Sequence, residues 1–150
     1  MGMFTSFDIN ASGLTAQRYR MDIISENVAN ANTTRTEDGT PYVRKVVTFT
    51  EKSGGGTSFS HVMDNVMNGS SYSGEGVKVS GVYEDTVTEM NMVYDPSHPD
   101  ADENGYVTYP NVNIITEMTN LIDATRSYEA NATAFDASKS MALKGLELGQ

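Results

Sequence analysis

The sequence predicts an α+β protein in which N- and C-terminal α-helices pair as a coiled-coil-like hairpin, with a small β-rich insert domain between them. Two observations lead to this prediction. Both ends of the chain carry apolar residues at heptad spacing without an interrupting proline, which is typical of helices that pack on other helices. The middle is rich in β-branched and aromatic residues separated by glycine and proline, which favours short strands and turns.

The N-terminal helical segment is predicted to cover residues 1–34. Its apolar residues repeat every seven positions, as they do along the seam of a coiled coil. The polar run from Asn30 to Thr34 tolerates turns and is expected to end the helix. The apolar stripe consists of Phe7, Leu14, Met21 and Val28, with Ala11 and Ile24 between them.

The insert domain is predicted to cover residues 35–109. Its β-branched and aromatic residues favour strands at residues 42–50, 77–83 and 106–109. The segment 86–94 is expected to pair with the strand at 77–83. The insert is therefore expected to contain a small antiparallel sheet.

Within the insert, a glycine- and serine-rich loop is predicted at residues 53–76, because its composition is that of flexible linkers. A short island at residues 59–67 has weakly amphipathic spacing. The simplest interpretation of the island is a mobile surface loop with one apolar face.

The C-terminal helical segment is predicted to cover residues 110–150. Asn111 and Asn113 are both suitable N-caps, and Glu117 lies in the first turn, where the helix dipole favours an anion. The stripe that follows is about five heptads long, which indicates coiled-coil packing. An ordinary intramolecular hairpin remains an alternative. The stripe consists of Ile114, Met118, Leu121, Thr125, Tyr128, Ala132, Phe135, Lys139, Ala142 and Leu146.

Composition and charge exclude several classes of function. The hydrophobic fraction of 38%, without tryptophan, is lean for a self-sufficient globule, so some burial against partners is expected. A net charge of -10 disfavours nucleic acid and anionic membrane surfaces, which both select for lysine and arginine. The absence of cysteine excludes disulfides and thiolate chemistry. The first ten residues lack the basic and apolar regions of a cleavable signal peptide.

The acidic stretch near residue 100 is the one place where a metal site can be argued from the sequence. Asp100, Asp102, Asn104 and Gly105 match the first half of a calcium-binding EF-hand loop, but Asn111 stands where the loop needs a bidentate glutamate. A rigid polar turn is the favoured interpretation, and an acidic Ca²⁺-binding secreted module is the alternative from another class.

We expect no catalytic, cofactor-binding or metal site, and no small-molecule substrate. His61 and His98 lie in different predicted loops, and no nucleophile motif is present. The protein is therefore predicted not to be an enzyme.

Three segments carry a resemblance to a known family. Residues 12–33, from Ser12-Gly13-Leu14 through Ser25-Glu26-Asn27-Val28-Ala29-Asn30, resemble the N-terminal signature shared by bacterial flagellar rod and hook proteins. Residues 117–149, including Arg126-Ser127-Tyr128-Glu129-Ala130-Asn131, are similar to the C-terminal signature of the same family. The block from Tyr94 to Asn113 resembles one proximal-rod member specifically.

The resemblance implies a structural subunit of the proximal rod in the flagellar basal body, which self-assembles into the shaft that transmits motor torque. The implied partners are copies of itself, other proximal- and distal-rod proteins, the membrane-ring/export-gate adaptor and the type III flagellar export apparatus. The implied location is the rod outside the cytoplasmic membrane, reached without a cleavable signal peptide. Another flagellar axial subunit, from the rod or hook, is the alternative within the family.

The two apolar stripes supply the residues that are predicted to form the assembly interface. Small and polar residues interrupt both stripes, so neighbouring subunits are expected to complete their packing. The predicted interface residues are Leu14, Met21, Ile24, Val28, Met118, Leu121, Tyr128, Phe135 and Leu146.

Overall fold

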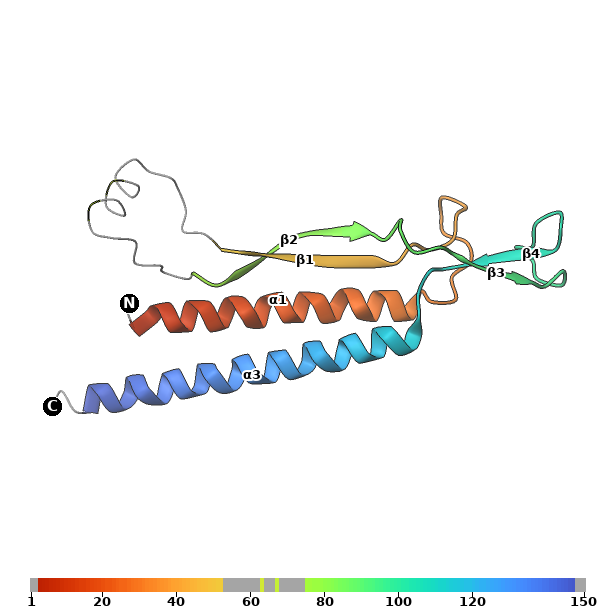
Figure 1. The fold of residues 1–150 in the computed structure, drawn as a ribbon. Helices are drawn as coiled ribbons and strands as arrows, with labels where there is room; N and C mark the ends of the chain where they lie inside the picture. The colour runs from red at the N-terminus through yellow and green to blue at the C-terminus, as the bar shows by residue number, and fades with distance from the viewer. Residues whose placement is uncertain (1–2, 53–62, 64–66, 68–74, 148–150) are drawn as a thin grey trace. The chain divides into compact units, whose positions relative to one another are not determined.

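The computed structural model describes residues 3–52, 63, 67 and 75–147 (Figure 1). The predicted α+β class is confirmed, since the chain has a helix at each end and, between them in sequence, two small antiparallel sheets. Most of the predicted loop at 53–76, with its island, lies outside the described residues. The elements in chain order are α1 (Met3–Ala29), β1 (Lys45–Glu51), β2 (Val77–Glu84), β3 (Asn91–Tyr94), β4 (Tyr106–Tyr109) and α3 (Ile114–Glu147).

Side-chain hydrogen bonds explain where α1 ends and where α3 begins. The predicted stop after α1 is confirmed, because the helix ends at Ala29 and the Asn30 side chain donates to the Glu26 carbonyl at 3.0 Å. At the start of α3, the backbone N–H groups of Ile115 and Thr116 donate to Asn113 Oδ1 at 3.0 and 3.2 Å. Of the two candidate N-caps, Asn113 is therefore the one that caps this helix.

The predicted pairing of segment 86–94 with the strand at 77–83 is wrong. β2 pairs with β1, and β3 pairs with β4. The reason lies at Asp85, whose Oδ1 accepts hydrogen bonds from the backbone N–H groups of Val87 (3.2 Å) and Thr88 (3.1 Å). This Asx-type turn diverts the chain as β2 ends, so β3 begins only at Asn91.

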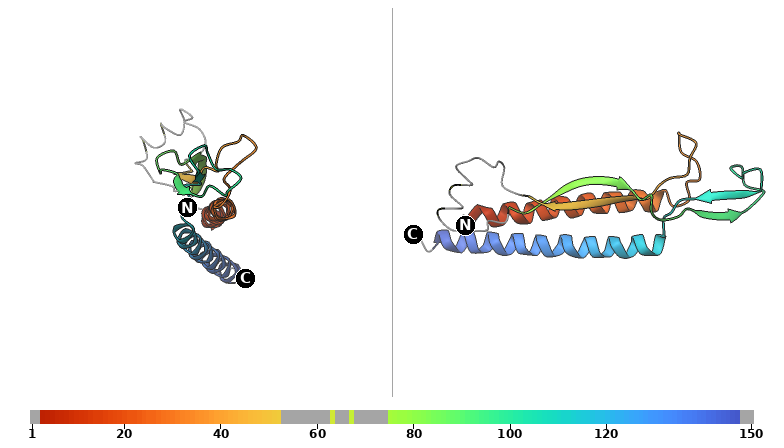
Figure 2. Two further views of the ribbon diagram at one scale, coloured as in Figure 1. Left: turned by 90° about the vertical axis from the view of Figure 1, so that its right-hand side faces the viewer. Right: turned by 45° about the horizontal axis from the view of Figure 1, so that its top comes forward.

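The hairpin of β3 and β4 is antiparallel, with Asn91 opposite Tyr109 and Tyr94 opposite Tyr106 (Figure 2). The rings of this tyrosine pair meet edge to face, with centroids 5.3 Å apart. The intervening loop is a series of polar turns. Asp102 Oδ1 accepts from the backbone N–H groups of Asn104 and Tyr106, and Gly105 adopts a positive φ of 82°.

The chain packs as two compact units, and each unit draws on both terminal helices. Unit 1 combines parts of Met1–Ala16, Phe49–Val79 and Tyr128–Gln150. Unit 2 combines Gln17–Thr48 with Ser80–Ser127. The domain boundaries expected from the sequence stay a prediction.

Unit 1 is held by contacts between α1 and α3 and between α1 and β2. The rings of Phe7 and Phe135 meet edge to face with centroids 5.1 Å apart. Gly13 lies so close to Asn131 that an added Cβ would stand 2.9 Å from Asn131 Oδ1. The start of β2 is fixed by Ser12 Oγ, which accepts from the Val77 N–H at 3.1 Å.

Among the described residues, most of the buried hydrophobic side chains lie in unit 2 and form its core. Small and β-branched side chains dominate it, which lets the backbone segments approach closely. Tyr42 lies in this core beside Ala31 and Val112. The buried hydrophobic residues of the unit are Ile24, Ala31, Tyr42, Val107, Val112 and Ala124.

Candidate assembly interface

The residues predicted to form the assembly interface differ widely in exposure. Ile24 is buried, whereas Met118 and Leu146 are 55% and 64% exposed. Those between these extremes are half-buried: Leu14, Met21, Val28, Leu121, Tyr128 and Phe135.

Two of the predicted residues contact the opposite terminal helix within their own unit. In unit 1, Phe135 meets Phe7. In unit 2, Thr125 Oγ1 lies 3.5 Å from the Met21 sulfur, to which it donates a weak hydrogen bond. The inner part of both stripes is therefore used within one chain, and the contact of the exposed part with neighbouring subunits stays a prediction.

The N-terminal half of α3 presents an apolar face to solvent. Ile115, Met118 and Ile122 are 78%, 55% and 52% exposed. Their spacing of three and four residues places them on one side of the helix. A contiguous apolar face on a helix with otherwise polar surroundings is typical of a protein–protein contact. The predicted stripe includes Met118 but not Ile115 and Ile122, because its spacing of four and three residues was counted from Ile114.

A polar cluster lies inside unit 2, and the sequence analysis did not predict it. We define it as Asn27, Arg44, Asp85, Asn111 and Glu117. Among the described residues, the buried polar side chains are Asn27, Asn111 and Glu117, all at or below 5% exposure. These residues come from α1, the chain before β1, the turn after β2 and the start of α3. The cluster therefore joins both helices of the unit to the segments before β1 and after β2.

Asn27 lies at the centre of the polar cluster with its amide fully hydrogen-bonded. Its Nδ2 donates to the Lys45 carbonyl at 2.8 Å and to Glu117 Oε2 at 3.1 Å. Its Oδ1 accepts from the Tyr42 hydroxyl and the Lys45 N–H, both at 2.9 Å. A buried asparagine with four partners fixes the position of each, because leaving any of them unpaired is unfavourable.

Arg44 bridges the two carboxylates of the cluster. Its Nε and one terminal nitrogen donate to Glu117 Oε1 at 2.9 and 2.8 Å, and the other terminal nitrogen lies 3.3 Å from Asp85 Oδ2. Burial works against the charge of Arg44, but the hydrogen bonds and charge of Glu117 outweigh it and raise the Arg44 pKa. Hydrogen bonds from Thr88, Val87 and Arg44 lower the pKa of Asp85.

Asn111 connects the cluster to the turn after β2. Its Oδ1 accepts from the Arg44 N–H at 2.9 Å, and its Nδ2 donates to the carbonyls of Asp85 (2.7 Å) and Thr88 (3.1 Å). The role expected from the sequence for this residue was an alternative N-cap. Its actual partners lie more than twenty residues away in the chain, where no local pattern could indicate them.

Raising the pH above 10 is expected to destabilise the fold through Tyr42. Burial, with the nearby charges of Glu26, Glu117 and Glu84, raises the pKa of Tyr42 from 10.0 to about 12. The unfolded chain therefore loses the phenolic proton first, and the stabilisation present below pH 10 is lost as the pH rises towards 12. The denaturant concentration at the midpoint of unfolding should fall more steeply with pH for the natural chain than for Tyr42→Phe, which has no phenolic proton to lose. If the midpoints of the two chains depend equally on pH, the loss of stability does not come from Tyr42.

Asp100 of the acidic loop is held by donors from the segment that follows α1. Asp100 Oδ2 accepts from Thr34 Oγ1 at 2.8 Å, and its other oxygen lies 3.7 Å from Arg35. In the described part of the chain, no three histidine or acidic residues are grouped so that they could hold a metal ion. No helix in that part combines the length and hydropathy that a membrane span requires.

Comparison with known proteins shows to which class of protein the chain belongs. Residues 7–35 match the family model for flagella basal body rod proteins, and residues 103–148 match the C-terminal model of flagellar basal body rod FlgEFG proteins. The chain is thus a flagellar basal-body rod protein, as the resemblance of its terminal signatures indicated.

Full-length relatives define the particular family. The chain is 48% identical to the flagellar basal-body rod protein FlgC of Bacillus subtilis over 154 residues, covering 100% of both chains. It is 40% identical to FlgC of Borreliella burgdorferi, covering 100% of this chain and 99% of the relative, and 39% identical to FlgC of Salmonella typhimurium over 100% of both. The chain belongs to the FlgC family. The narrower resemblance of the block from Tyr94 to Asn113 is thereby confirmed.

Proposed function

We propose that this chain is a structural subunit of the proximal rod, where copies of it and other rod proteins build the shaft that transmits motor torque. The observation that carries the proposal is the 48% identity to a FlgC protein along the whole chain. The geometry supports it, because α3 leaves Ile115, Met118 and Ile122 exposed on one face. In a rod, neighbouring subunits cover such a face.

The proposal extends to how the subunit reaches its place. We propose export through the flagellar type III apparatus without a cleavable signal, and contact with the membrane-ring/export-gate adaptor and the distal rod. The similarity along the whole chain to proteins named flagellar basal-body rod protein supports this proposal. The location would then be the rod, outside the cytoplasmic membrane.

The proposed role is structural and not catalytic. The charged groups of the polar cluster bind one another: Arg44 pairs with both Glu117 and Asp85, and the Glu117 side chain is 1% exposed. Groups engaged in this way stabilise a fold but have no access to a substrate. The cluster therefore supports a rigid building block.

Deletion of the gene for this chain in its own host tests the proposal. The expected result is loss of swimming in soft agar and recovery on re-expression, with the chain detected by mass spectrometry in purified basal bodies. Motile deletion cells, or basal bodies that lack the chain, would refute the proposal.

A further inference from the structure

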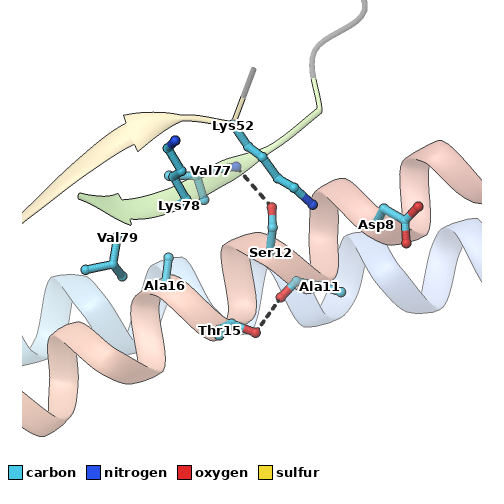
Figure 3. Close-up of a pocket in the computed structure, with 9 residues that line it drawn as sticks. All are labelled: Asp8, Ala11, Ser12, Thr15, Ala16, Lys52, Val77, Lys78 and Val79. Carbon is cyan, nitrogen blue, oxygen red and sulfur yellow. Dashed lines mark hydrogen bonds between the residues drawn. The ribbon is translucent and has the colours of Figure 1, made fainter. Parts of the chain in front are cut away.

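A groove with a volume of about 540 Å³ lies in unit 1 between α1 and the neighbouring ends of β1 and β2 (Figure 3). Its apolar lining comes from Ala11 and Ala16 of α1 and from Val77 and Val79 of β2. Lys52 and Lys78 add two positive charges at the strand side and Asp8 of α1 adds one negative charge, so the lining carries a net charge of +1. The groove can therefore accept apolar side chains that approach together with negative charge.

The geometry of the groove is fixed by its own backbone. Ser12 Oγ accepts from the Val77 N–H at 3.1 Å, as the dashed line in Figure 3 shows. The residue before Val77 is Gly76, with a φ of 101° and no room for a Cβ, which would stand 2.2 Å from Ser12 Oγ. α1 and β2 are thus held at close range, and the groove beside this contact is preformed.

In the same unit, α3 extends beyond the start of α1. The pairs Phe7 with Phe135 and Gly13 with Asn131 show that the two helices run antiparallel here. From Phe135, α3 continues to Glu147, a rise of about 18 Å, whereas α1 begins at Met3, about 6 Å from Phe7. Figures 1 and 2 both show this projecting end of α3. The last turns of α3 therefore lie past the end of α1.

The projecting end carries an apolar pair. Leu143 and Leu146 are 53% and 64% exposed and lie one turn apart. Leu146 continues the helix face that carries Phe135, because eleven residues make about three turns. Glu147 and the negative end of the helix dipole lie beside this pair.

We propose that the end of α3, through Leu143 and Leu146, docks in the α1–β2 groove of a second copy of this chain. The apolar pair matches the alanine and valine lining. Glu147 and the negative helix C-terminus suit the net positive groove with Lys52 and Lys78, and Lys144 in the same last turn suits Asp8 of the groove. This contact joins two different surfaces of identical chains, so it can repeat from copy to copy and builds an open helical array where the rotation does not close into a ring. The inference rests on the proposed rod function and names the surface by which copies join.

Cross-linking in assembled basal bodies tests the contact, since the natural chain has no cysteine. Cells should produce two single-cysteine forms together, Ala11→Cys in the groove and Leu146→Cys at the end of α3. Treatment of their basal bodies with a short bismaleimide is expected to give a product of twice the chain mass. Neither form alone should give it. Any such product joins two copies, because each copy carries one thiol.

Met141→Cys is the matched control for Leu146→Cys, because it lies five residues earlier, about 140° round the same helix end. Combined with Ala11→Cys, it should give at least fivefold less product. If Ala11→Cys fails to support swimming, Lys78→Cys, an exposed position lining the same groove, replaces it.

Three results overturn the inference. Basal bodies that contain both forms but give no product would show that another surface joins the copies. A thiol at position 11 that does not react with maleimide in the isolated chain would show that the chain itself fills the groove. Equal product from Met141→Cys and Leu146→Cys would show that the contact is not specific. By contrast, if the chain with its natural sequence is absent from purified basal bodies, the proposed rod function itself is wrong.

Discussion

Replacement of Glu117 by alanine is expected to lower the free energy of unfolding by about 3 kcal/mol. The substitution removes the carboxylate that receives two hydrogen bonds from Arg44 and one from Asn27. Since Glu117 is 1% exposed, water cannot replace it fully, and the guanidinium loses its main partner in a partly buried site. Urea denaturation of the purified chain, followed by circular dichroism at neutral pH, measures the difference.

Glu129→Ala is the matched control, because Glu129 is an exposed glutamate on the same helix. It should change the free energy of unfolding by about 0.5 kcal/mol or less. Glu117→Gln should fall between the two, since the amide keeps the volume and one acceptor but loses the charge. A loss of under 1 kcal/mol for Glu117→Ala would mean that the polar cluster does not hold unit 2 together.

The terminal helices could be predicted because their signals are local. Heptad spacing and the absence of proline placed a helix at each end, and the Asn113 side chain marks the start of α3. Strand positions also followed from composition, as at β2, which the sequence placed at residues 77–83 and the structure at Val77–Glu84. Such features depend on residues within one or two turns of each other.

Strand pairing and the polar cluster could not be predicted because both depend on distant residues. Asn27 and Glu117 are hydrogen-bonded although 90 positions separate them. Each looked explicable by itself, Asn27 as part of a family signature and Glu117 as an anion near a helix dipole. For Asn27, the sequence does contain a signal that could have indicated burial. Asn27 lies three residues after the apolar Ile24 and next to Val28 on α1, and a polar residue buried at such a position usually has a hydrogen-bond partner.

The interface prediction was limited by a different cause. A heptad stripe marks residues that face another helix, but it does not say whether that helix belongs to the same chain. Here Phe135 faces Phe7 of its own chain, whereas Met118 and Leu146 stay exposed. The exposed part of the stripe, extended by Ile115 and Ile122, stays a prediction of where subunits meet.

Ile122→Asp is expected to abolish swimming while leaving the isolated chain folded. Ile122 is 52% exposed on the same face as Met118 and Ile115, so the isolated chain should lose about 1 kcal/mol or less. In the rod, a neighbour would bury an unpaired carboxylate in an apolar contact. We expect this to weaken each contact by about 2 kcal/mol, or roughly 30-fold in affinity. Soft-agar swimming and the amount of chain in purified basal bodies are the measurements.

Thr116→Asp separates the effect of the face from the effect of added charge. Thr116 is exposed on the same helix but lies about 120° away from Ile122. Its variant should swim normally, and Met118→Asp should behave like Ile122→Asp. If both apolar positions accept aspartate without loss of swimming, this face does not meet a neighbour. If Thr116→Asp also stops swimming, charge anywhere on this end of α3 is harmful, and the contact must be wider than the apolar face. The comparison is decisive because all three positions lie within nine residues of the helix start, where α3 is anchored by Asn113 and Glu117 in every variant.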